Sequence, residues 1–522
     1  MAQNRQNRKQ IGKVFNDPIH GHIEMHPLLV RIIDTPQFQR LRNIKQLGAG
    51  YFVYPGASHN RFEHSLGVAH LAGRLVKQLR EHQQDTERDT ERDINDTDEL
   101  CVQIAGLCHD LGHGPFSHVF DGKFMPEAKA LWEKKHEDIS LEMFDYLIKH
   151  KPSEGKKTIE DVMREDYGFK DEDFTFIKEM IQPFESMGCG RNGWPFKGRG
   201  EKKAYLYDIV SNKINGIDVD KMDYFARDSY YLGMRSSFDH ERFIMFARVC
   251  EVGGRLQICQ RDKEVRNMYD LFYTRSLLHN RAYQHKVVKI IETMIKDALL
   301  AADGKGGIKI AETVINRDME AYTKLTDIIL YQIMNSPHEE LQEAQRILRK
   351  IEYRQLYHCL LDEKIKPCQL KNRHEKTAER DALVEQIKLE LPGTDIKKED
   401  FEINVITVDY GMKEEDPIEK CNFYRKPNDS TAKEASTASG ATPEHEAQYE
   451  TKTITKDEVS DLLPVMFYEK RVHVYYKGSS ENCQNIKNAI QVLKNWVKAK
   501  KEHTTGCNPT DQVTVICGRN EA

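Results

Sequence analysis

Apolar side chains recur at helical spacing along most of the chain. Val68, Leu71 and Leu75, for example, lie three or four positions apart and so share one face of a helix. The same period predicts helices over 28–46 with a break at Pro36, over 131–150, through most of 205–300, and over 318–361. Polar residues fill 81–98, which we interpret as a loop between two helices. The pattern predicts a mainly α-helical fold.

Alternating stretches near the N-terminus predict strands. Residues 11–24 form two such stretches around a turn at Asp17-Pro18. His20, His22 and His26 accompany them, and their spacing places them on one side of a strand without a carboxylate pair. We therefore interpret these histidines as strand residues and not as metal ligands.

Later strand patterns suggest how the chain is divided. Gly253-Gly254 suits the tight turn of a hairpin near 252–259. A strand at 472–477 and a helix at 482–501 predict a smaller α+β lobe. The expected segments are a disordered stretch at 1–10, a helical core at 11–363, a charged connection at 364–400, the α+β lobe at 401–501 with a disordered insert at 426–448, and a tail at 502–522.

Charge and cysteine usage narrow the class of protein. Lys and Arg number 78 against 83 Asp and Glu, a net charge of −5, which argues against a generally basic nucleic-acid binder but not against a local basic patch. No apolar run approaches the roughly 20 residues of a membrane span, and the first ten residues contain no apolar core of a secretory signal. The 11 cysteines form no C-x-x-C, which fits reduced thiols in cytosol or nucleus. We expect the nearest candidate pair, Cys250 and Cys259, to be buried thiols.

The densest group of chemically active side chains follows an apolar run that begins at Cys101. Adjacent His109 and Asp110 cannot share a helix face as an i, i+4 pair would, so they converge on one ion only at a helix end. Gly112 and Gly114 supply that turn, because glycine adopts backbone angles closed to other residues. Imidazole and carboxylate ligands suit iron, manganese, zinc or nickel. This stretch therefore predicts a metal site at a helix end.

Two further candidate ligands lie far away in the sequence. His64 precedes a helical pattern, and Asp220 ends the stretch Gly216–Asp220. Together with His109 and Asp110 they give the order H…HD…D, which resembles the HD phosphohydrolase superfamily. That resemblance implies a helical fold with one metal ion at its centre, held by His64, His109, Asp110 and Asp220.

The segments RFEHSLGV, AGLCHDLGHGPFSH, NGIDVDK-DYFARD and RAYQHKV narrow the resemblance. They are similar to the family of SAM-and-HD-domain deoxynucleoside triphosphate triphosphohydrolases, over about residues 13–361 and more thinly to 477. Family members carry a SAM domain before the HD domain, and we expect this chain to be a form without it. The resemblance implies a transition metal ion (zinc, iron or manganese) in the HD site and magnesium on the nucleotide phosphates.

Proton transfer requires groups that titrate near neutral pH, and histidine is the ordinary choice. The candidates are His113, His118, Asp121 and His136. By resemblance, His136 is catalytic, and His118 with Asp121 is an acid with its orienting partner. From the residues alone His136 would be a surface residue of a helix, and the sequence leaves open which histidine protonates the leaving group.

The resemblance also implies a deoxynucleotide site. Cations would hold the triphosphate, polar groups would contact the sugar 3′-hydroxyl, and Tyr283 would exclude a ribose 2′-hydroxyl sterically. We expect all four deoxynucleotides as substrates, with deoxynucleoside and intact triphosphate as products. The residues at the matching positions are Arg61, Gln46, Leu47, Lys221, Tyr224, Asp228, Arg275, His279 and Tyr283.

Two effector sites follow from the same resemblance. A carboxylate can accept from guanine nitrogens and an arginine can donate to O6 and N7. For GTP or dGTP the matching positions are Lys13, Val14, Asp34, Gln39, Arg42 and Arg354. For a deoxynucleotide they are Asn16, Val53, Arg242, Arg261, Lys263, Lys286, Val287, His358 and Lys477, where His358 replaces a lysine of the family. Filling these sites would assemble dimers into a homotetramer.

The biological expectation is control of deoxynucleotide pools, and through it of viral DNA synthesis, in nucleus or cytoplasm. Two alternatives stay open at this stage. One is an HD phosphohydrolase acting on another nucleotide, such as a nucleoside monophosphate or a cyclic nucleotide. The other is a single-stranded nucleic-acid-binding protein whose hydrolase site is vestigial. Tyr283, Gln46 and the segment 34–42 favour the first expectation over a generic HD enzyme.

Overall fold

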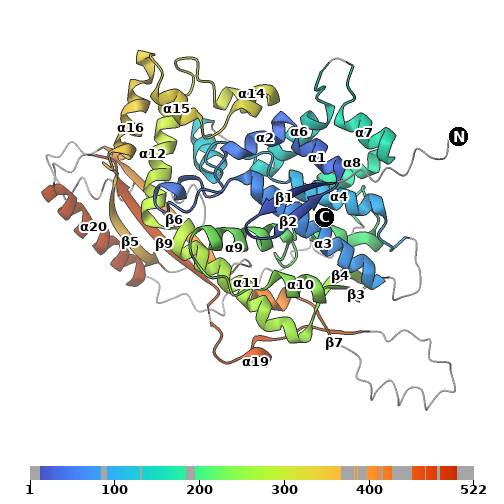
Figure 1. Cartoon of the computed structure of the whole chain (residues 1–522). Coiled ribbons are helices and arrows are strands. Elements are labelled where there is room, and N and C mark those ends of the chain that lie inside the picture. Colours follow the sequence, from blue (N-terminus) through green and yellow to red (C-terminus); the bar gives the residue numbers. More distant parts are fainter. Residues whose placement is uncertain are drawn as a thin grey trace, which may run out of the picture. The chain divides into compact units, whose positions relative to one another are not determined.

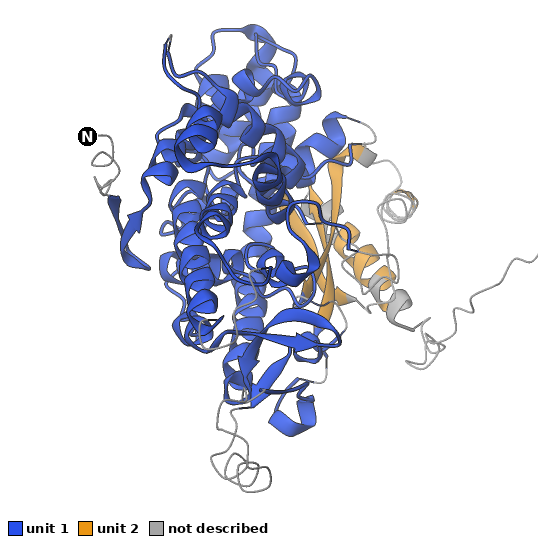
Figure 2. Cartoon of the chain, turned by 90° about the vertical axis from the view of Figure 1, so that its right-hand side faces the viewer, with its two compact units in different colours: residues 1–355, 409–467 blue, residues 356–408, 468–522 orange. Residues whose placement is uncertain are grey.

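The computed structural model divides the chain into two compact units (Figure 2). Unit 1 comprises Met1–Gln355 and Asp409–Phe467, and unit 2 comprises Leu356–Val408 and Tyr468–Ala522. The structure describes residues 12–83, 91–129, 132–153, 155–183, 194–365, 381, 385, 389, 397–410, 412, 415–425, 449–464, 466–478 and 483–502. The expected segments at 1–10 and 426–448, most of the connection at 364–400 and nearly all of the tail lie outside these residues.

Helices make up most of unit 1, as the apolar spacing predicts (Figure 1). The earlier ones are α1 (Pro27–Ile33), α2 (Pro36–Gln39), α3 (Arg61–Gln83), α4 (Asp96–Cys108), α5 (Met125–Ala128), α6 (His136–Lys149), α7 (Ile159–Tyr167) and α8 (Asp171–Ile181). The later ones are α9 (Val219–Tyr231), α10 (His240–Phe246), α11 (Val265–Leu278), α12 (Lys286–Ala302), α13 (Ala311–Ile315), α14 (Met319–Lys324), α15 (Ile329–Met334), α16 (Gln342–Glu352) and α19 (Lys456–Val459). Short stretches of tighter or wider helix are η1 (Arg40–Asn43), η2 (Gly48–Phe52), η3 (Phe120–Phe124), η4 (Glu201–Asp208), η5 (Asp262–Glu264), η6 (His279–Tyr283), η7 (Glu339–Leu341) and η9 (Pro417–Lys420).

Helices α3 and α4 form the centre of unit 1. Val68, Leu71 and Leu75 of α3 are buried, as their spacing predicts. Gly106 of α4 faces α3 so closely that an added Cβ would lie 3.3 Å from the Cβ of Ala72. This close approach brings the start of α3 and the end of α4, both of which carry predicted metal ligands, to the same region.

Two small sheets accompany the helices of unit 1. The predicted N-terminal hairpin is confirmed: β1 (Lys13–Asp17) pairs antiparallel with β2 (Gly21–Met25). The second sheet has the order β3-β4-β7-β8, with β3 (Arg248–Val252), β4 (Arg255–Arg261), β7 (Phe423–Arg425) and β8 (Glu450–Lys452). Gly253 and Gly254 form its first turn with φ of 59° and 81°, which confirms the predicted hairpin. Cys250 and Cys259 on this hairpin are buried free thiols, as expected.

Unit 2 is the smaller α+β part that the sequence predicts. Its sheet has the order β5-β9-β6, formed by β5 (His358–Ile365), β9 (Tyr468–Tyr476) and β6 (Phe401–Asp409). The turn η8 (Lys398–Asp400) and helix α20 (Cys483–Glu502) complete it, and Leu493 packs with Val472 and Val474 in a separate apolar core. The fold class, mainly α with a smaller α+β part, is confirmed.

Several predicted boundaries differ from the structure. Residues 318–361 contain three short helices and then strand β5, because Leu360 and Leu361 enter the core of unit 2 and β5 pairs with β9. Helix α6 begins at His136 and not at 131, since Asp138 accepts the Lys135 N–H at 2.8 Å and caps the helix there. The stretch 81–98 is helical at both ends, because Asn95 and Asp98 cap α4 reciprocally.

The C-terminal lobe is also divided differently from the expected single segment at 401–501. Residues 409–467 belong to unit 1. Strand β7 pairs parallel with β4 through Gln260 and Arg261, and Tyr269 donates its hydroxyl to Asp416 at 2.7 Å. These contacts hold the inserted segment against the helical unit. Among the described residues, no helix has the length and apolar character needed to cross a membrane.

Candidate metal centre and active site

One cavity of about 520 Å³ in unit 1 collects most of the residues predicted to bind metal or substrate or to transfer protons. It is lined by every residue expected to bind substrate and by three of the four expected proton-handling residues, so segments from 46 to 292 of the sequence meet there. Of the predicted metal ligands, His109, Asp110 and Asp220 line the cavity, and His64 lies behind them, fully buried.

The metal-ligand candidates come from three helices. His64 belongs to the first turn of α3, His109 is the C-cap of α4, and Asp220 lies in the first turn of α9. Asp110 follows His109 at the point where α4 ends, as the adjacent pair requires. Gly112 then lets the chain pass under α6, because an added Cβ would lie 2.1 Å from the backbone oxygen of His136.

His64 and His109 use their ring nitrogens in the same way: Nδ1 donates a hydrogen bond and Nε2 faces carboxylates. Nδ1 of His64 donates to Asp223 Oδ2 at 2.7 Å, and Nδ1 of His109 donates to the Gly106 carbonyl at 2.7 Å. Each Nε2 then faces carboxylates: His64 Nε2 lies 3.1 Å from Asp220 Oδ1, and His109 Nε2 lies 3.4 Å from Asp110 Oδ1 and 3.5 Å from Asp220 Oδ1. His109 Nε2 is buried and makes no hydrogen bond within the described structure.

This arrangement fits a divalent cation. With Nδ1 protonated, each Nε2 presents a lone pair to carboxylate oxygens, and such contacts repel unless a positive charge lies between them. The same carboxylates can instead attract a second proton to the His64 ring: burial disfavours the charged ring, yet hydrogen bonds to Asp220 and Asp223 raise the pKa of His64 to about 10. The carboxylates therefore require positive charge at the position where an ion would bind. Two imidazoles and two carboxylates are suitable ligands for a divalent transition metal.

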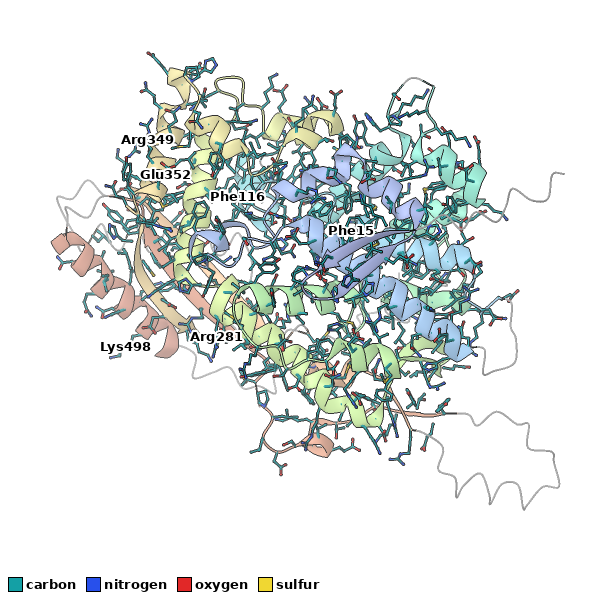
Figure 3. The ribbon with its side chains drawn as sticks, viewed as in Figure 1. Phe15, Phe116, Arg281, Arg349, Glu352 and Lys498 are labelled. Atoms are coloured by element: carbon teal, nitrogen blue, oxygen red, sulfur yellow. The ribbon has the colours of Figure 1, made fainter. Side chains whose placement is uncertain are left out.

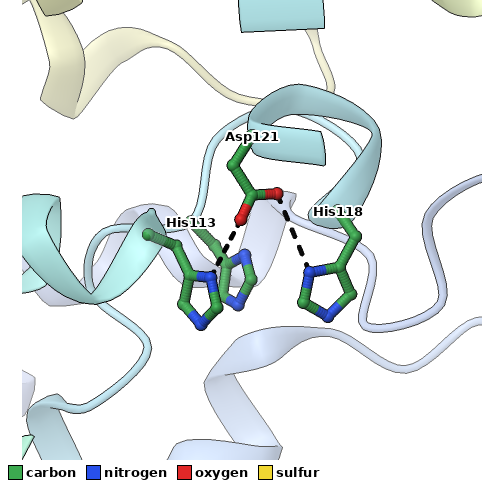
Figure 4. Close-up of side chains that lie close together, drawn as sticks. His113, His118 and Asp121 are labelled. Atoms are coloured by element: carbon green, nitrogen blue, oxygen red, sulfur yellow. Dashed lines mark hydrogen bonds and ion pairs between the residues drawn. The ribbon is translucent and has the colours of Figure 1, made fainter. Parts of the chain in front are cut away.

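A second compact cluster lies in the same cavity. Nδ1 of His136 donates to Asp121 Oδ2 at 2.9 Å, and its ring stacks on His113 with centroids 3.9 Å apart. His118 Nδ1 lies 3.7 Å from the other oxygen of Asp121 (Figure 4). The possible ligand atoms of these four side chains all lie within 4.8 Å of one another. The cluster is therefore built around one carboxylate that orients two imidazoles.

The two stacked imidazoles of this cluster, His136 and His113, have pKa values shifted in opposite directions. Burial opposes a charged His136, but the hydrogen bond to Asp121 and nearby carboxylates raise its pKa. Burial and the Arg61 guanidinium hold the pKa of His113 well below its ordinary range. The surroundings therefore favour the cationic form at His136 and the neutral form at His113. Helix α6 carries His136 into this contact, which the local sequence Lys135-His136-Glu137 did not reveal.

Three cations of the cavity are engaged with carboxylates. Arg61 donates to Asp110 Oδ2 at 2.7 Å, and Lys221 donates to Asp218 at 2.8 Å. Arg275 donates to Asp409 at 3.2 Å. An anionic ligand that enters this cavity meets three cations whose present partners are acidic and can be exchanged.

Asp228 also lines the cavity and accepts two hydrogen bonds. The hydroxyl of Tyr283 donates to Asp228 Oδ2, and His59 Nε2 donates to Asp228 Oδ1 at 2.6 Å. His59 is buried and stacks on Tyr231 with centroids 4.5 Å apart. The sequence analysis did not single out His59, because an isolated histidine before a helix carries no signal without its partner.

The turn after the HD pair is held by residues that the sequence analysis also missed. Phe116, labelled in Figure 3, and Ser117 adopt φ of 59° and 55°. The carboxylate of Asp327 accepts the N–H groups of Phe116 and Lys45 at 2.6 and 2.8 Å, which joins this turn to the segment that carries Gln46. Such strained positions persist only where the surroundings determine them.

Arg40 supports the same turn through hydrogen bonds to backbone carbonyls. We expect Arg40→Met to lower the free energy of unfolding. Its buried guanidinium donates to the carbonyls of Leu111, His113 and Leu325 at 2.8–3.0 Å. Methionine leaves these buried carbonyls without donors, at an expected cost of about 3–5 kcal/mol. Urea unfolding measures this change. The control Lys324→Met removes an exposed pair with Glu320 and should change the free energy by less than about 1 kcal/mol, so equal losses would contradict the assignment.

The residues expected to bind effectors fall into separate surface groups. Lys13 pairs with Asp34 at 3.5 Å, and Arg42 donates to Gln39 at 2.8 Å. The Arg354 guanidinium donates to the Phe52 carbonyl at 2.7 Å, beside Val53. Of the others, Val14 and Asn16 lie on β1, Arg242 and Arg261 flank Phe246, Lys263 lies in η5, Lys286 and Val287 begin α12, and His358 and Lys477 belong to unit 2, where Lys477 pairs with Glu402 at 3.5 Å.

Comparison with known proteins agrees with this geometry. Residues 61–228 match the HD domain family. The chain is 51% identical over 477 residues to the human deoxynucleoside triphosphate triphosphohydrolase SAMHD1, covering 89% of this chain and 70% of the relative. The mouse protein of the same name is 48% identical over 91% of this chain and 70% of its own. The SAMHD1 homolog of Dictyostelium discoideum is 34% identical over 98% of this chain and 85% of its own. On this similarity and on the assembled HD site, the chain belongs to the SAMHD1 family of deoxynucleoside triphosphate triphosphohydrolases.

Proposed function

We propose that the protein hydrolyses deoxynucleoside triphosphates to deoxynucleoside and triphosphate. The observation that carries the proposal is one cavity that combines an H…HD…D metal centre, a His136–Asp121 pair and three exchangeable cations. The relatives named for this activity support it at about half identity over most of the chain.

Each part of the cavity has a chemical task. His64, His109, Asp110 and Asp220 would hold the divalent ion, which makes a bound water more acidic and accepts a phosphate oxygen. Zinc, iron and manganese all suit these ligands, and magnesium would bridge the phosphates of the nucleotide. Arg61, Lys221 and Arg275 bind the triphosphate.

The reaction transfers oxygen from water to the α-phosphorus. The bond from that phosphorus to the sugar 5′-oxygen breaks, and the 5′-oxygen gains a proton. Asp121 accepts from Nδ1 of His136 and so leaves Nε2 of His136 available to hold or transfer a proton. His118, beside the other oxygen of Asp121, is the second residue that can supply the proton of the leaving group.

Sugar recognition rests on Tyr283 and Asp228. The Asp228 carboxylate would accept a hydrogen bond from the 3′-hydroxyl. The Gln46 amide could accept from or donate to the same hydroxyl, with Tyr224 beside them. Leu47 and His279 complete the lining. The half-buried Tyr283 ring, whose hydroxyl donates to Asp228, would occupy the space that a 2′-hydroxyl needs.

We expect Tyr283→Ala to reduce the discrimination between dGTP and GTP as substrates. Loss of the ring opens space for a 2′-hydroxyl, and a selectivity factor of about 10²-fold or more should fall toward unity. The ratio of kcat/KM for the two nucleotides measures this. Tyr273→Ala on the exposed face of α11 is the matched control and should keep the wild-type ratio. An unchanged ratio in Tyr283→Ala would assign the selection to another residue.

Regulation is part of the same proposal. GTP or dGTP would bind where Lys13, Asp34, Gln39 and Arg42 lie, and a deoxynucleotide would bind at the neighbouring set, with homotetramer assembly as the consequence. The resemblance also motivates the proposal of a nuclear or cytoplasmic role in limiting deoxynucleotide pools and viral DNA synthesis.

Incubation of dGTP with the metal-loaded protein and GTP, followed by separation of the products, tests the activity. Formation of deoxyguanosine with triphosphate supports it, and formation of dGMP would favour a different HD phosphohydrolase.

A further inference from the structure

A fully buried charged network lies behind the metal centre. Asp223 accepts Nδ1–H of His64 at 2.7 Å and Nε2–H of His20 at 2.7 Å. The Arg227 guanidinium donates Nε and Nη2 to the same carboxylate at 2.8 and 2.9 Å. Asp223, Arg227 and His64 are each 0% exposed. Asp223 thus both fixes a metal ligand and contacts the N-terminal hairpin.

The network continues into that hairpin. Arg227 donates its remaining Nη1 to Asp17 Oδ2 at 2.8 Å. The other oxygen of Asp17 accepts the N–H groups of Ile19 and His20, both at 2.9 Å, and so shapes the turn between β1 and β2. The turn is therefore bonded to the support of His64 at two points, through Asp17 and through His20.

The helices are arranged to admit this network. Asp220, Asp223 and Arg227 are three and four positions apart on α9 and share one face. On α3, Gly67 lies three positions after His64, and an added Cβ would lie 1.8 Å from Asp223 Oδ1 and 2.6 Å from Arg227 Nη2. Only glycine at position 67 leaves room for the carboxylate and guanidinium in their present places.

Second partners of metal-bound histidines fix the ring orientation and increase ligand basicity. Burial of an unpaired charge is costly, so the hydrogen bonds that join Asp17, Arg227, Asp223 and His20 tie the four residues into one cooperative group. A change of hairpin position that moves Asp17 or His20 must alter the hydrogen bonds of Asp223, and through them His64.

We propose that Asp223 is the positioning residue for the metal ligand His64, and that Asp17, Arg227 and His20 couple the β1–β2 hairpin to the metal centre. The inference rests on the proposed function, because Lys13, Val14 and Asn16, which precede Asp17 on β1, are the proposed effector contacts. Coupling is reciprocal by thermodynamic necessity. A nucleotide that holds the hairpin therefore strengthens retention of the metal ion.

The test measures release of zinc from the zinc-loaded full chain into a colorimetric chelator. Asp223→Asn should increase zinc loss about 10–100-fold, the usual range for such outer partners. This variant removes the negative charge that Arg227 faces at Asp223 and can therefore fail to fold. Gly67→Ala and Asp17→Asn test the same network. Gly67→Ala displaces the Asp223 carboxylate, and Asp17→Asn keeps the turn acceptor but removes the charge facing Arg227. Asp318→Asn, which changes a helix cap outside the network, is the matched control and should release zinc at the wild-type rate.

The coupling itself is tested by adding GTP. GTP should slow zinc release from the wild-type protein at least about fivefold, and Asp17→Asn should lose this slowing while still binding GTP in calorimetry. Wild-type release rates in Asp17→Asn and Gly67→Ala, or bound GTP without effect on the wild type, would overturn the coupling. Failure of the proposed function is distinguishable, because the wild-type protein would then take up no zinc or bind no GTP at all.

Discussion

Replacement of His109 by alanine should remove the metal ion and lower kcat by at least about 10³-fold. His109 Nε2 is buried, makes no hydrogen bond within the described structure and faces Asp110 and Asp220 at 3.4 and 3.5 Å. Without this imidazole the two carboxylates lose a ligand partner and a divalent ion loses about a quarter of its protein contacts. Asp220→Ala should behave in the same way.

Elemental analysis of purified proteins measures the first effect and the rate of triphosphate release from dGTP measures the second. His338→Ala, an exposed histidine outside the cavity, is the control and should retain both metal and turnover. Full metal occupancy in both ligand variants would show that these residues do not hold the ion.

Replacement of His136 by alanine should leave the metal in place and lower kcat about 10²–10⁴-fold, the usual contribution of a general acid–base group. The ring donates to Asp121 at 2.9 Å and stacks on His113, and neither of these partners is a predicted metal ligand. Metal content near that of the wild type with strongly reduced turnover is the expected combination.

The pH profile gives a second measurement of the same residue. Against the effect of burial, Asp121 raises the pKa of His136, so the cationic form is present below that raised pKa and is lost as pH increases through it. Activity that requires the imidazolium should therefore decline on the alkaline side. Asp121→Asn removes the carboxylate and should move this decline to lower pH. Wild-type turnover in His136→Ala, or a pH profile unaffected by Asp121→Asn, would contradict the role.

The convergence of His109 and Asp110 could be predicted because its signal is local. The pair stands at the end of an apolar helix with Gly112 after it, and the structure places it where the chain turns. The position of His136 in the cavity was expected only by resemblance, since it depends on the approach of α6 to Gly112, a contact between segments far apart in sequence. Asp223 was missed because a carboxylate four residues before Arg227 has the spacing of an ordinary helical ion pair.

The same distinction applies to the fold. Helical periodicity and the Gly253-Gly254 turn predict elements from neighbouring residues, and those elements are present. The pairing of β7 with β4 joins residues more than 150 positions apart, so no local pattern assigns 409–467 to unit 1. Strand β5 was predicted as helix because the pattern of its apolar residues does not by itself distinguish a strand from a helix. Pairing with β9 makes it a strand.

The position of bond cleavage tests the central claim most directly. The metal-loaded protein is incubated with dGTP and GTP in water enriched in ¹⁸O, and the masses of the separated products are measured by mass spectrometry. Attack of water on the α-phosphorus predicts one ¹⁸O atom in inorganic triphosphate, with unlabelled deoxyguanosine as the other product. Formation of dGMP with pyrophosphate, release of single phosphate groups, or label in the deoxyguanosine hydroxyl would contradict the account.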